Sequence, residues 1–344
     1  MRDGDVTVLS AREVAAALEG REVELLETVR RAYEAHGEGQ SSLPHSVFLR
    51  FPGEARNRII GLPAYLGADF GVAGFKWVSS FPGNLARGLD RASAVVVQNS
   101  TQTGRPEAIL EGSIISGTRT AASAALAARS LRGGLTYSQA GVIGCGYINF
   151  LTLRFLLAAC PEIEGLVLYD LDPARAAQFE DKCRALNRRL DVRVAADADV
   201  VVRECPLVSL ATTSISPHLS DLSACRPGGT ILHISLRDFT PEVILGCDNV
   251  VDDVDHVCRE QTSVHLAEQL VGHRDFIRCT LADILRGLAP ARRDDDSTVI
   301  FSPFGLGVLD LAVSKLTLDL ARQAGAGTVI KGFLPGSWVD SSAG

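Results

Sequence analysis

Residues 142–149 read Val142-Ile143-Gly144-Cys145-Gly146-Tyr147-Ile148-Asn149, a G-x-G-x-x-N stretch between an apolar strand-like run and a helix-like run. The first glycine permits a tight turn. The second lets the backbone approach a pyrophosphate, which the free N–H groups at the start of a helix would bind. Asn149 stands where Gly or Ala is usual, so we expect slightly looser packing of helix on strand. The stretch predicts a dinucleotide-binding turn; a purely structural glycine turn is the alternative.

Asp170 closes the next predicted strand and strengthens this interpretation. A carboxylate there would accept hydrogen bonds from the adenosine ribose hydroxyls and would repel a 2′-phosphate, which favours NAD over NADP. Asp172 competes for the same role, but we favour it as the N-cap of a helix that starts at Pro173. A flavin is less favoured, because flavin folds usually carry this motif near the N-terminus.

Apolar strands and helices alternate on either side of this turn, and such alternation predicts a parallel sheet. The first 120 residues have a different pattern, with helices at 10–20 and 22–36 followed by strands separated by turns. We therefore predict the α/β class, with a parallel sheet domain at 119–307 and an α+β domain at 1–118 and 308–344. The expected strands are 46–51, 58–65, 72–78 and 94–98 in the first domain, and 142–144, 166–170, 192–195, 207–211, 230–235 and 298–301 in the second; the expected helices are 118–129, 148–159, 173–186 and 308–324.

The composition of the chain argues against several classes of protein. The chain has 344 residues, of which 46% are apolar and 22% charged, with a net charge of −7. These values argue against disorder and against a nucleic-acid partner. There is no run of 18 apolar residues and the N-terminus is charged, so we expect a cytoplasmic protein with no membrane partner. The eight cysteines match no zinc spacing and are expected to be buried thiols.

Lys76 is one of four lysines in the chain and lies in a largely apolar predicted strand. It is expected either to hold a carboxylate or to be an edge lysine that reaches solvent. Arg119 follows Thr118 at the predicted start of a helix, where a cation opposes the helix dipole. Capture of a substrate carboxylate and a structural salt bridge are the two interpretations of Arg119.

Asp238 follows the predicted strand 230–235, at the edge where open α/β sheets bind ligands. It is a candidate general acid/base, with helix capping as the alternative, although Thr240 suits the cap better. Two charged clusters are given no function. Asp252, Asp253, Asp255 and His256 fit no common metal spacing, so no metal is predicted, and residues 292–296 read as a solvated loop.

Four motifs in one order resemble the ornithine cyclodeaminase/μ-crystallin family. They are Gly74-Phe75-Lys76-Trp77-Val78, residues 116–122 (SGTRTAA), the Gly144 turn, and residues 302–310 (SPFGLGVLD). The resemblance covers nearly the whole chain. It implies an NAD-dependent oxidoreductase acting on a CH–NH bond. It also implies a homodimer whose subunits have a Rossmann-type NAD-binding domain at 119–307 and a substrate-binding and dimerisation domain at 1–118 and 308–344, to which the last long helix returns.

Within that family, residues 48–52, 76–84, 89–94 and 232–238 look like the branch that makes L-2,3-diaminopropionate for siderophores and peptide antibiotics. That branch cleaves N-(2-amino-2-carboxyethyl)-L-glutamate oxidatively to 2-oxoglutarate and L-2,3-diaminopropionate. The alternatives are an ornithine cyclodeaminase, another imine or amino-acid dehydrogenase of the family, and a non-catalytic μ-crystallin-like binding protein.

The resemblance also implies roles for single residues. Lys76 and Arg119 would hold a substrate carboxylate, Asp238 and Lys76 would be the catalytic residues, and His45 and Arg50 would be further substrate contacts at positions that depart from the cyclodeaminase pattern. NAD would be contacted by Gly144, Gly146, Tyr147, Ile148, Asn149, Asp170, Ser93, Thr212, Ser235, Leu236, Phe304 and Gly305.

Overall fold

The computed structural model describes residues 4–336, and these form two compact units. The first unit contains residues 4–21, 35–119 and 306–336; the second contains 22–34 and 120–305. Two helices cross from one unit to the other in sequence, α2 (Glu22–Gly37) and α3 (Ser113–Leu131). Residues 22–34, expected in the first domain, group with the second unit, where Glu22 pairs with Arg154 at 2.5 Å and the hydroxyls of Tyr33 and Ser123 lie 2.7 Å apart.

The first unit is built on an eight-stranded sheet in the order β16-β1-β7-β6-β5-β4-β2, with β3 also paired to β4. Its neighbours are antiparallel except β1 and β7. The strands are β1 (Val6–Leu9), β2 (Ser41–Ser42), β3 (Val47–Phe51), β4 (Glu54–Leu66), β5 (Val72–Ser80), β6 (Ala92–Asn99), β7 (Pro106–Glu111) and β16 (Thr328–Ile330). The helical elements are α1 (Ala11–Leu18), the 3-10 turn η1 (Pro82–Arg87) and α11 (Gly307–Gln323).

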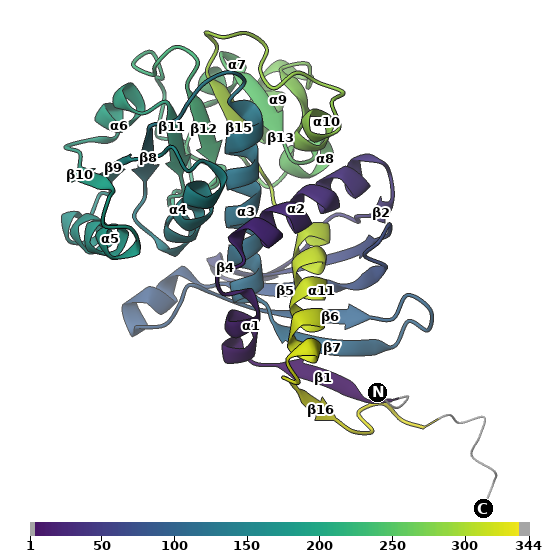
Figure 1. Cartoon of the computed structure of the whole chain (residues 1–344). Helices are drawn as coiled ribbons and strands as arrows, with labels where there is room; N and C mark the ends of the chain where they lie inside the picture. Colours follow the sequence, from purple (N-terminus) through teal and green to yellow (C-terminus); the bar gives the residue numbers. More distant parts are fainter. Residues whose placement is uncertain (1–3, 337–344) are drawn as a thin grey trace, which may run out of the picture. The chain divides into compact units, whose positions relative to one another are not determined.

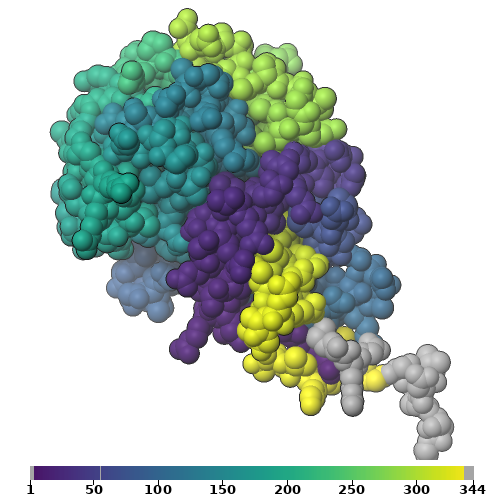
Figure 2. Space-filling view, viewed as in Figure 1, coloured from purple at the N-terminus to yellow at the C-terminus, as the bar shows by residue number. Residues whose placement is uncertain are grey.

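Helix α11 packs across β4, β5 and β6 and lies beside α1 (Figures 1 and 2). The contact is close at its start, because a Cβ at Gly307 would lie 3.1 Å from the Leu62 carbonyl oxygen. The opposite face of the sheet carries exposed apolar side chains: Val47 (62% exposed), Leu49 (44%), Tyr65 (41%) and Trp77 (37%). The sheet therefore has one face covered by α11 and one apolar face that nothing in its own unit covers completely.

The second unit is a fully parallel sheet in the order β10-β9-β8-β11-β12-β15-β13-β14, drawn in teal and green in Figure 1. The strands are β8 (Gln139–Ile143), β9 (Gly165–Tyr169), β10 (Asp191–Val194), β11 (Leu207–Leu210), β12 (Thr230–His233), β13 (Asp248–Val251), β14 (Ile277–Thr280) and β15 (Val299–Ser302). The helices are α4 (Tyr147–Ala159), α5 (Pro173–Leu186), α6 (Ala198–Glu204), α7 (Pro241–Leu245), α8 (Val254–Val257), α9 (Ser263–Val271) and α10 (Leu281–Leu285).

The predicted α/β fold class is confirmed, and most predicted elements lie within a few residues of the observed ones. Among the predicted elements, the largest shift of a boundary is at α3, which starts at Ser113 and not at Thr118. Arg119 is therefore in the second turn of the helix, where the dipole opposes a cation less than at the first turn. In the part of the chain that the structure describes, no helix is long and apolar enough to cross a bilayer.

Candidate functional site

The glycine turn after β8 has the predicted backbone. Gly144 has a φ of +90°, and a Cβ there would lie 2.4 Å from the Ala211 carbonyl oxygen, so only glycine fits. A Cβ at Gly146 would meet no atom within 4 Å. Gly146 is also the N-cap of α4, and no side chain caps that helix start. The turn thus offers uncovered space beside a helix N-terminus, which suits an anionic phosphate group.

Asn149 has a different role from the predicted cofactor contact. Its side chain is buried, and its amide nitrogen donates to the carbonyl oxygens of Ile143 (2.9 Å) and Gly144 (2.7 Å). Its amide oxygen accepts from the Ser209 hydroxyl at 2.7 Å. The expected looser packing is therefore wrong, because the amide fills the space and fastens the turn to β11.

Asp170 lies at the end of β9, as predicted, and its carboxylate is bound to the same turn. One oxygen accepts from the Cys145 backbone N–H at 2.7 Å, and the other accepts from the Asp172 N–H at 2.9 Å. Asp172 caps α5 by accepting from the backbone of Ala174 and Arg175, which confirms the favoured interpretation. Asp170 is thus the carboxylate held beside the glycine turn.

Asp238 lies just after β12 and is completely buried. Its carboxylate accepts hydrogen bonds from the hydroxyls of Thr212 and Ser235, the latter at 2.5 Å, and its Oδ2 lies 3.2 Å from His233 Nε2. The other ring nitrogen of His233 is 3.3 Å from the Ser302 hydroxyl. Asp238 does not cap α7, whose N-cap is Thr240, so the capping alternative is wrong.

These contacts decide the charge states of Asp238 and His233. Burial raises the pKa of Asp238, but the hydrogen bonds from His233, Ser235 and Thr212 outweigh burial and bring the pKa below its usual range. Burial lowers the pKa of His233, and the neighbouring Asp238 compensates only in part. An ionised carboxylate beside a neutral imidazole is the expected state near pH 7.

The Phe304–Gly305 segment at the end of β15 is held by a carboxylate that we had given no function. The two oxygens of buried Asp252 accept from the backbone N–H groups of Phe304 (2.9 Å) and Gly305 (2.7 Å). Burial raises the pKa of Asp252 to about 6, although both hydrogen bonds act against that rise. Gly305 has a φ of +94°, a conformation that favours glycine.

In the first unit, Lys76 and Arg119 meet at one buried carboxylate. Lys76 Nζ lies 2.7 Å from Asp310 Oδ2 and donates to the Ser116 hydroxyl at 3.0 Å. Arg119 donates through Nε to Asp310 Oδ1 at 3.0 Å. Lys76 and Asp310 are almost fully buried, and β5 is an interior strand, so Lys76 is not an edge lysine.

Two cations around one carboxylate leave an excess of one positive charge when all three groups are ionised. The pKa of Lys76 is lowered to about 8, mainly by burial and in part by the charge of Arg119, while Asp310 acts against this fall. A buried unbalanced charge is costly, and an incoming anion reduces that cost. The group of Lys76, Arg119 and Asp310, which we call the carboxylate clamp, therefore suits a ligand with one carboxylate at this position.

Not all predicted site residues belong to the glycine turn, the Asp238 contacts or the carboxylate clamp. Ser93 pairs with Ser79 and lies on the sheet face opposite to Lys76, whereas Arg50 is on the same face as Lys76. His45 is an exposed residue just before β3. Of the residues near the glycine turn, Tyr147 is 59% exposed and Ile148 is partly exposed. Leu236, in the turn before Asp238, has a left-handed φ of +68°.

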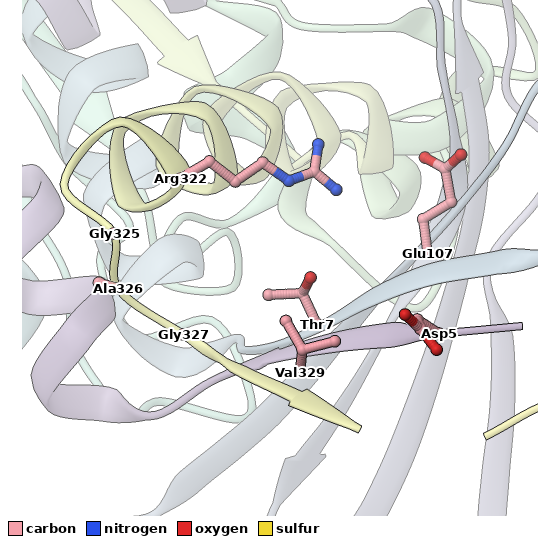
Figure 3. Close-up of a pocket in the computed structure, with 8 residues that line it drawn as sticks. All are labelled: Asp5, Thr7, Glu107, Arg322, Gly325, Ala326, Gly327 and Val329. Carbon is pink, nitrogen blue, oxygen red and sulfur yellow. The ribbon is translucent and has the colours of Figure 1, made fainter. Parts of the chain in front are cut away.

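A hollow of about 660 Å³ opens at the far edge of the first unit's sheet (Figure 3). It is lined by Asp5, Thr7, Glu107, Arg322, Gly325, Ala326, Gly327 and Val329. None of the predicted site residues lines it. Within residues 4–336, no three His, Cys, Asp or Glu side chains are placed to hold a metal ion.

Sequence reasoning missed Asp310, Asp252 and His233 as members of these groups. A signal was available for Asp310, because it is an acid at the start of an otherwise apolar helix and belongs to the 302–310 motif. Asp252 had a weaker signal, as an acid at the end of an apolar strand. The partners of both residues lie far away in sequence, which is why spacing alone did not identify them.

A parallel sheet of this strand order, with a glycine turn after β8 and polar side chains at the carboxyl ends of β11, β12 and β15, defines the Rossmann class of α/β proteins. A family model narrows the class: residues 5–325 match the ornithine cyclodeaminase/mu-crystallin family, and the chain belongs to that family.

The names of similar proteins state several different activities. The chain is 28% identical over 316 residues to N-((2S)-2-amino-2-carboxyethyl)-L-glutamate dehydrogenase of Staphylococcus aureus, covering 89% of this chain and 92% of that protein. A Δ(1)-pyrroline-2-carboxylate reductase of Thermococcus litoralis, solved with NADH and L-proline, has a TM-score of 0.85 at 25% identity over 94% of this chain and 99% of its own. An archaeal alanine dehydrogenase dimer with bound NAD has a TM-score of 0.85 at 26% identity over 95% and 99%.

Proposed function

We propose that this protein is an NAD-dependent dehydrogenase that oxidises the secondary amine N-(2-amino-2-carboxyethyl)-L-glutamate and releases 2-oxoglutarate and L-2,3-diaminopropionate. The observation that carries the proposal is the carboxylate clamp, which suits the α-carboxylate of an amino-acid-derived amine. The substrate itself is proposed from the resemblance of residues 76–84 and 232–238 to the diaminopropionate branch, supported by the similarity to the staphylococcal dehydrogenase.

We assign cofactor binding to the second unit. Gly144, Gly146 and the start of α4 would hold the pyrophosphate, Asp170 would bind the ribose, and Phe304–Gly305 would contact the nicotinamide. The open position at Gly146 and the uncapped helix start fit such a group. When bound, NAD accepts a hydride from the substrate.

We assign substrate orientation to the carboxylate clamp. Lys76 and Arg119 hold the carboxylate, and Asp310 fixes the direction of both cations, because it accepts from Arg119 Nε and forms an ion pair with the Lys76 ammonium. Orientation of this kind contributes several kcal/mol to rate acceleration, and up to about 7–11 in ideal cases.

Asp238 is assigned the proton transfers. Oxidation of the amine gives an imine, and cleavage then requires a water molecule to add to the imine carbon and a proton to reach the leaving nitrogen. Asp238 has no exposed atom, so we propose that protons reach it through the hydroxyls of Thr212 and Ser235, which both donate to it. The neutral His233 keeps the carboxylate in place from the other side.

The apolar sheet face of Val47, Leu49, Tyr65 and Trp77 supports a homodimer. Exposed apolar groups of this kind mark interaction surfaces, and the archaeal alanine dehydrogenase is described as a dimer. We therefore propose a homodimer that covers this face.

Formation of NADH at 340 nm tests the function. We expect reduction of NAD with N-(2-amino-2-carboxyethyl)-L-glutamate and little or none with L-ornithine, L-alanine or L-proline. Turnover of one of those amino acids in place of the secondary amine would assign the chain to another activity of the family. A chain that binds amino acids and NAD but forms no NADH with any of these amines would be a binding protein.

A further inference from the structure

The segment between β15 and α11 is irregular, and one carboxylate directs its backbone. The segment consists of Pro303, Phe304, Gly305 and Leu306. Pro303 has no backbone N–H, whereas the N–H groups of Phe304 and Gly305 donate to the two oxygens of Asp252 at 2.9 and 2.7 Å. Asp252 directly follows β13 and is 1% exposed. It therefore sets the direction of two consecutive peptide groups in the segment.

The carbonyl groups of these two peptides point away from Asp252. No cis peptide bond occurs in residues 4–336, and the N–H and C=O groups of a trans peptide point in opposite directions. Strand β15 has β13 on one side and β12 on the other. Because Asp252 approaches from the β13 side, the carbonyl oxygens of Pro303 and Phe304 are directed toward the β12 side.

The β12 side is where the groups assigned to the cofactor and to proton transfer lie. Asp238 follows β12, and the glycine turn follows β8, two strands further along the sheet. The Ser302 hydroxyl at the end of β15 lies 3.3 Å from Nδ1 of His233, whose other ring nitrogen lies beside Asp238. Carbonyl oxygens directed to this side suit a ligand with N–H donors, and the carboxamide of a nicotinamide ring has two.

The side chain of Phe304 is also fixed. It is half-buried and packs against the apolar core of the second unit, and its ring centre lies 6.2 Å from that of His256. His256 is held in turn by Asp253, whose Oδ1 is 2.8 Å from Nδ1 of the ring. The segment is thus ordered through its backbone and through its aromatic ring, so less entropy is lost when a ligand binds there.

We propose that Asp252 is a positioning residue for the nicotinamide half of NAD, because it holds the Pro303 and Phe304 carbonyl groups in the direction from which they bind that half. The inference rests on the proposed function for the place of the nicotinamide, and it adds a residue that acts through the backbone of another segment. Replacement of Asp252 is expected to weaken the contacts to the nicotinamide alone. The contacts to the adenosine and the pyrophosphate, assigned to Asp170 and the glycine turn, are expected to remain.

Calorimetric titration of the full chain with NAD and with ADP-ribose tests this role. ADP-ribose keeps the adenosine, the pyrophosphate and the second ribose of NAD and lacks the nicotinamide. We expect wild type to bind NAD about tenfold more tightly than ADP-ribose.

The variant D252N keeps the volume of the side chain and removes one of its two acceptor oxygens. The amide places an N–H2 group at that position, where it faces a backbone N–H. We expect D252N to lose the preference for NAD, while its affinity for ADP-ribose stays within about twofold of wild type. D255N, which removes an exposed carboxylate of α8, is the matched control and is expected to keep the preference of wild type.

The pH dependence of the preference adds a test that needs no variant. Burial raises the pKa of Asp252 to about 6, and the charge of Asp253 adds to the rise. Below that pH the carboxyl group is protonated and donates through one oxygen, so one of the two backbone N–H groups loses its acceptor. We therefore expect the preference of wild type for NAD to be present at about pH 7.5 and largely lost at about pH 5, and D252N to behave alike at both.

Other ionisable groups face the segment from its neighbours. They are Asp253 and His256 on the side of β13 and α8, and His233 and Asp238 on the side of β12, whereas residues 299–307 contain none. A pH dependence caused by one of these groups would persist in D252N, so the comparison with wild type separates them from Asp252.

Three results would overturn the inference: equal affinity of wild type for NAD and ADP-ribose, an unchanged preference in D252N, or a pH dependence of the same size in D252N and wild type. If D252N does not fold, the wild-type titrations alone decide, and an equal preference at about pH 7.5 and about pH 5 overturns the inference. The proposed function fails separately. A protein that shows the Asp252-dependent preference but forms no NADH from N-(2-amino-2-carboxyethyl)-L-glutamate retains the nicotinamide subsite and loses the proposed reaction.

Discussion

At the scale of single residues, Asp310 has the largest influence on the carboxylate clamp. It is completely buried and receives Lys76 on one oxygen and Arg119 on the other. Without it, two cations would face each other in a buried place with no opposite charge. Asp310 is therefore a positioning residue that also keeps Lys76 protonated.

The charge state of Lys76 predicts a pH limit. Its pKa is about 8 in the folded protein, below the usual value because of burial, so the ammonium loses its proton as pH rises through 8. We expect kcat/KM to fall over that range. In D310N the carboxylate that raises the pKa of Lys76 is lost, so the fall moves to lower pH, and kcat/KM at pH 7 decreases about tenfold or more.

The pH profile of kcat/KM measures this effect, with D319N as the control, because Asp319 lies on the same helix and pairs with Lys315 at a partly exposed position. K76R is expected to abolish the fall near pH 8, because arginine stays charged. An identical pH profile in D310N and wild type would contradict the role of Asp310.

The contacts of Asp238 predict that its substitution lowers turnover and leaves cofactor binding nearly unchanged. Its hydroxyl and imidazole partners leave an ionised carboxylate, so D238N keeps the volume and removes the charge. We expect kcat to fall by about 10²- to 10⁴-fold, while NADH affinity from fluorescence titration stays within a few-fold of wild type. A D238N protein with wild-type kcat would exclude Asp238 from the proton transfers.

At the scale of elements, carboxylates at the ends of two parallel strands bind the backbone of the loops that follow neighbouring strands. The end of β13 supplies Asp252, which binds the Phe304–Gly305 backbone after β15, and the end of β9 supplies Asp170, which binds the glycine turn after β8. The loops after β8 and β15 are therefore each fixed by a carboxylate from another strand, which places their backbone before any ligand binds.

The opposite edge of the same sheet is held by Arg292, which we had expected in a solvated loop. That interpretation is wrong for Arg292, which is buried and donates to the carbonyl oxygens of Leu131, Gly228, Gly229 and Ser297 and to the Thr230 hydroxyl, whereas residues 293–296 are exposed and irregular as expected. One guanidinium thus binds several acceptors around the start of β12, two of which have a second partner: the Gly229 carbonyl oxygen accepts from the Val299 N–H, and the Thr230 hydroxyl lies 2.9 Å from the Tyr137 hydroxyl.

Arg292 is therefore expected to contribute to the stability of the fold and not to catalysis. R292A removes one donor group from five acceptors at once, and we expect a loss of about 3 kcal/mol or more in the free energy of unfolding by urea. R293A, which removes an exposed neighbour, is expected to cost less than about 1 kcal/mol. A cost for R292A as small as that of R293A would show that water replaces the guanidinium.

Local patterns predicted most of the longer strands and helices, but they missed several short elements and the contacts between elements. The capping box at Ser10 and Glu13, the helix start at Pro173 and the glycine turn depend on neighbours in sequence, and all three are observed. The short strands β1, β7 and β16 were missed, because each is stabilised mainly by its partners in the sheet.

At the scale of the whole molecule, each of the two units holds a different group of polar residues. The first unit holds the carboxylate clamp, and the second holds the glycine turn and the Asp238 network. The motifs of both kinds were visible in the sequence, because they use rare residues such as Lys76 or fixed glycine spacing. Asp310 was not assigned, because its two partners are about 190 and 230 residues away along the chain.

The account's central claim is that an NAD-dependent oxidation cleaves a glutamate-derived secondary amine. The most direct measurement is the product balance after incubation of the full-length protein with NAD and N-(2-amino-2-carboxyethyl)-L-glutamate. We expect one 2-oxoglutarate and one L-2,3-diaminopropionate for each NADH formed. NADH formation without 2-oxoglutarate, or no NADH from this amine while ornithine, alanine or proline is oxidised, would contradict the claim.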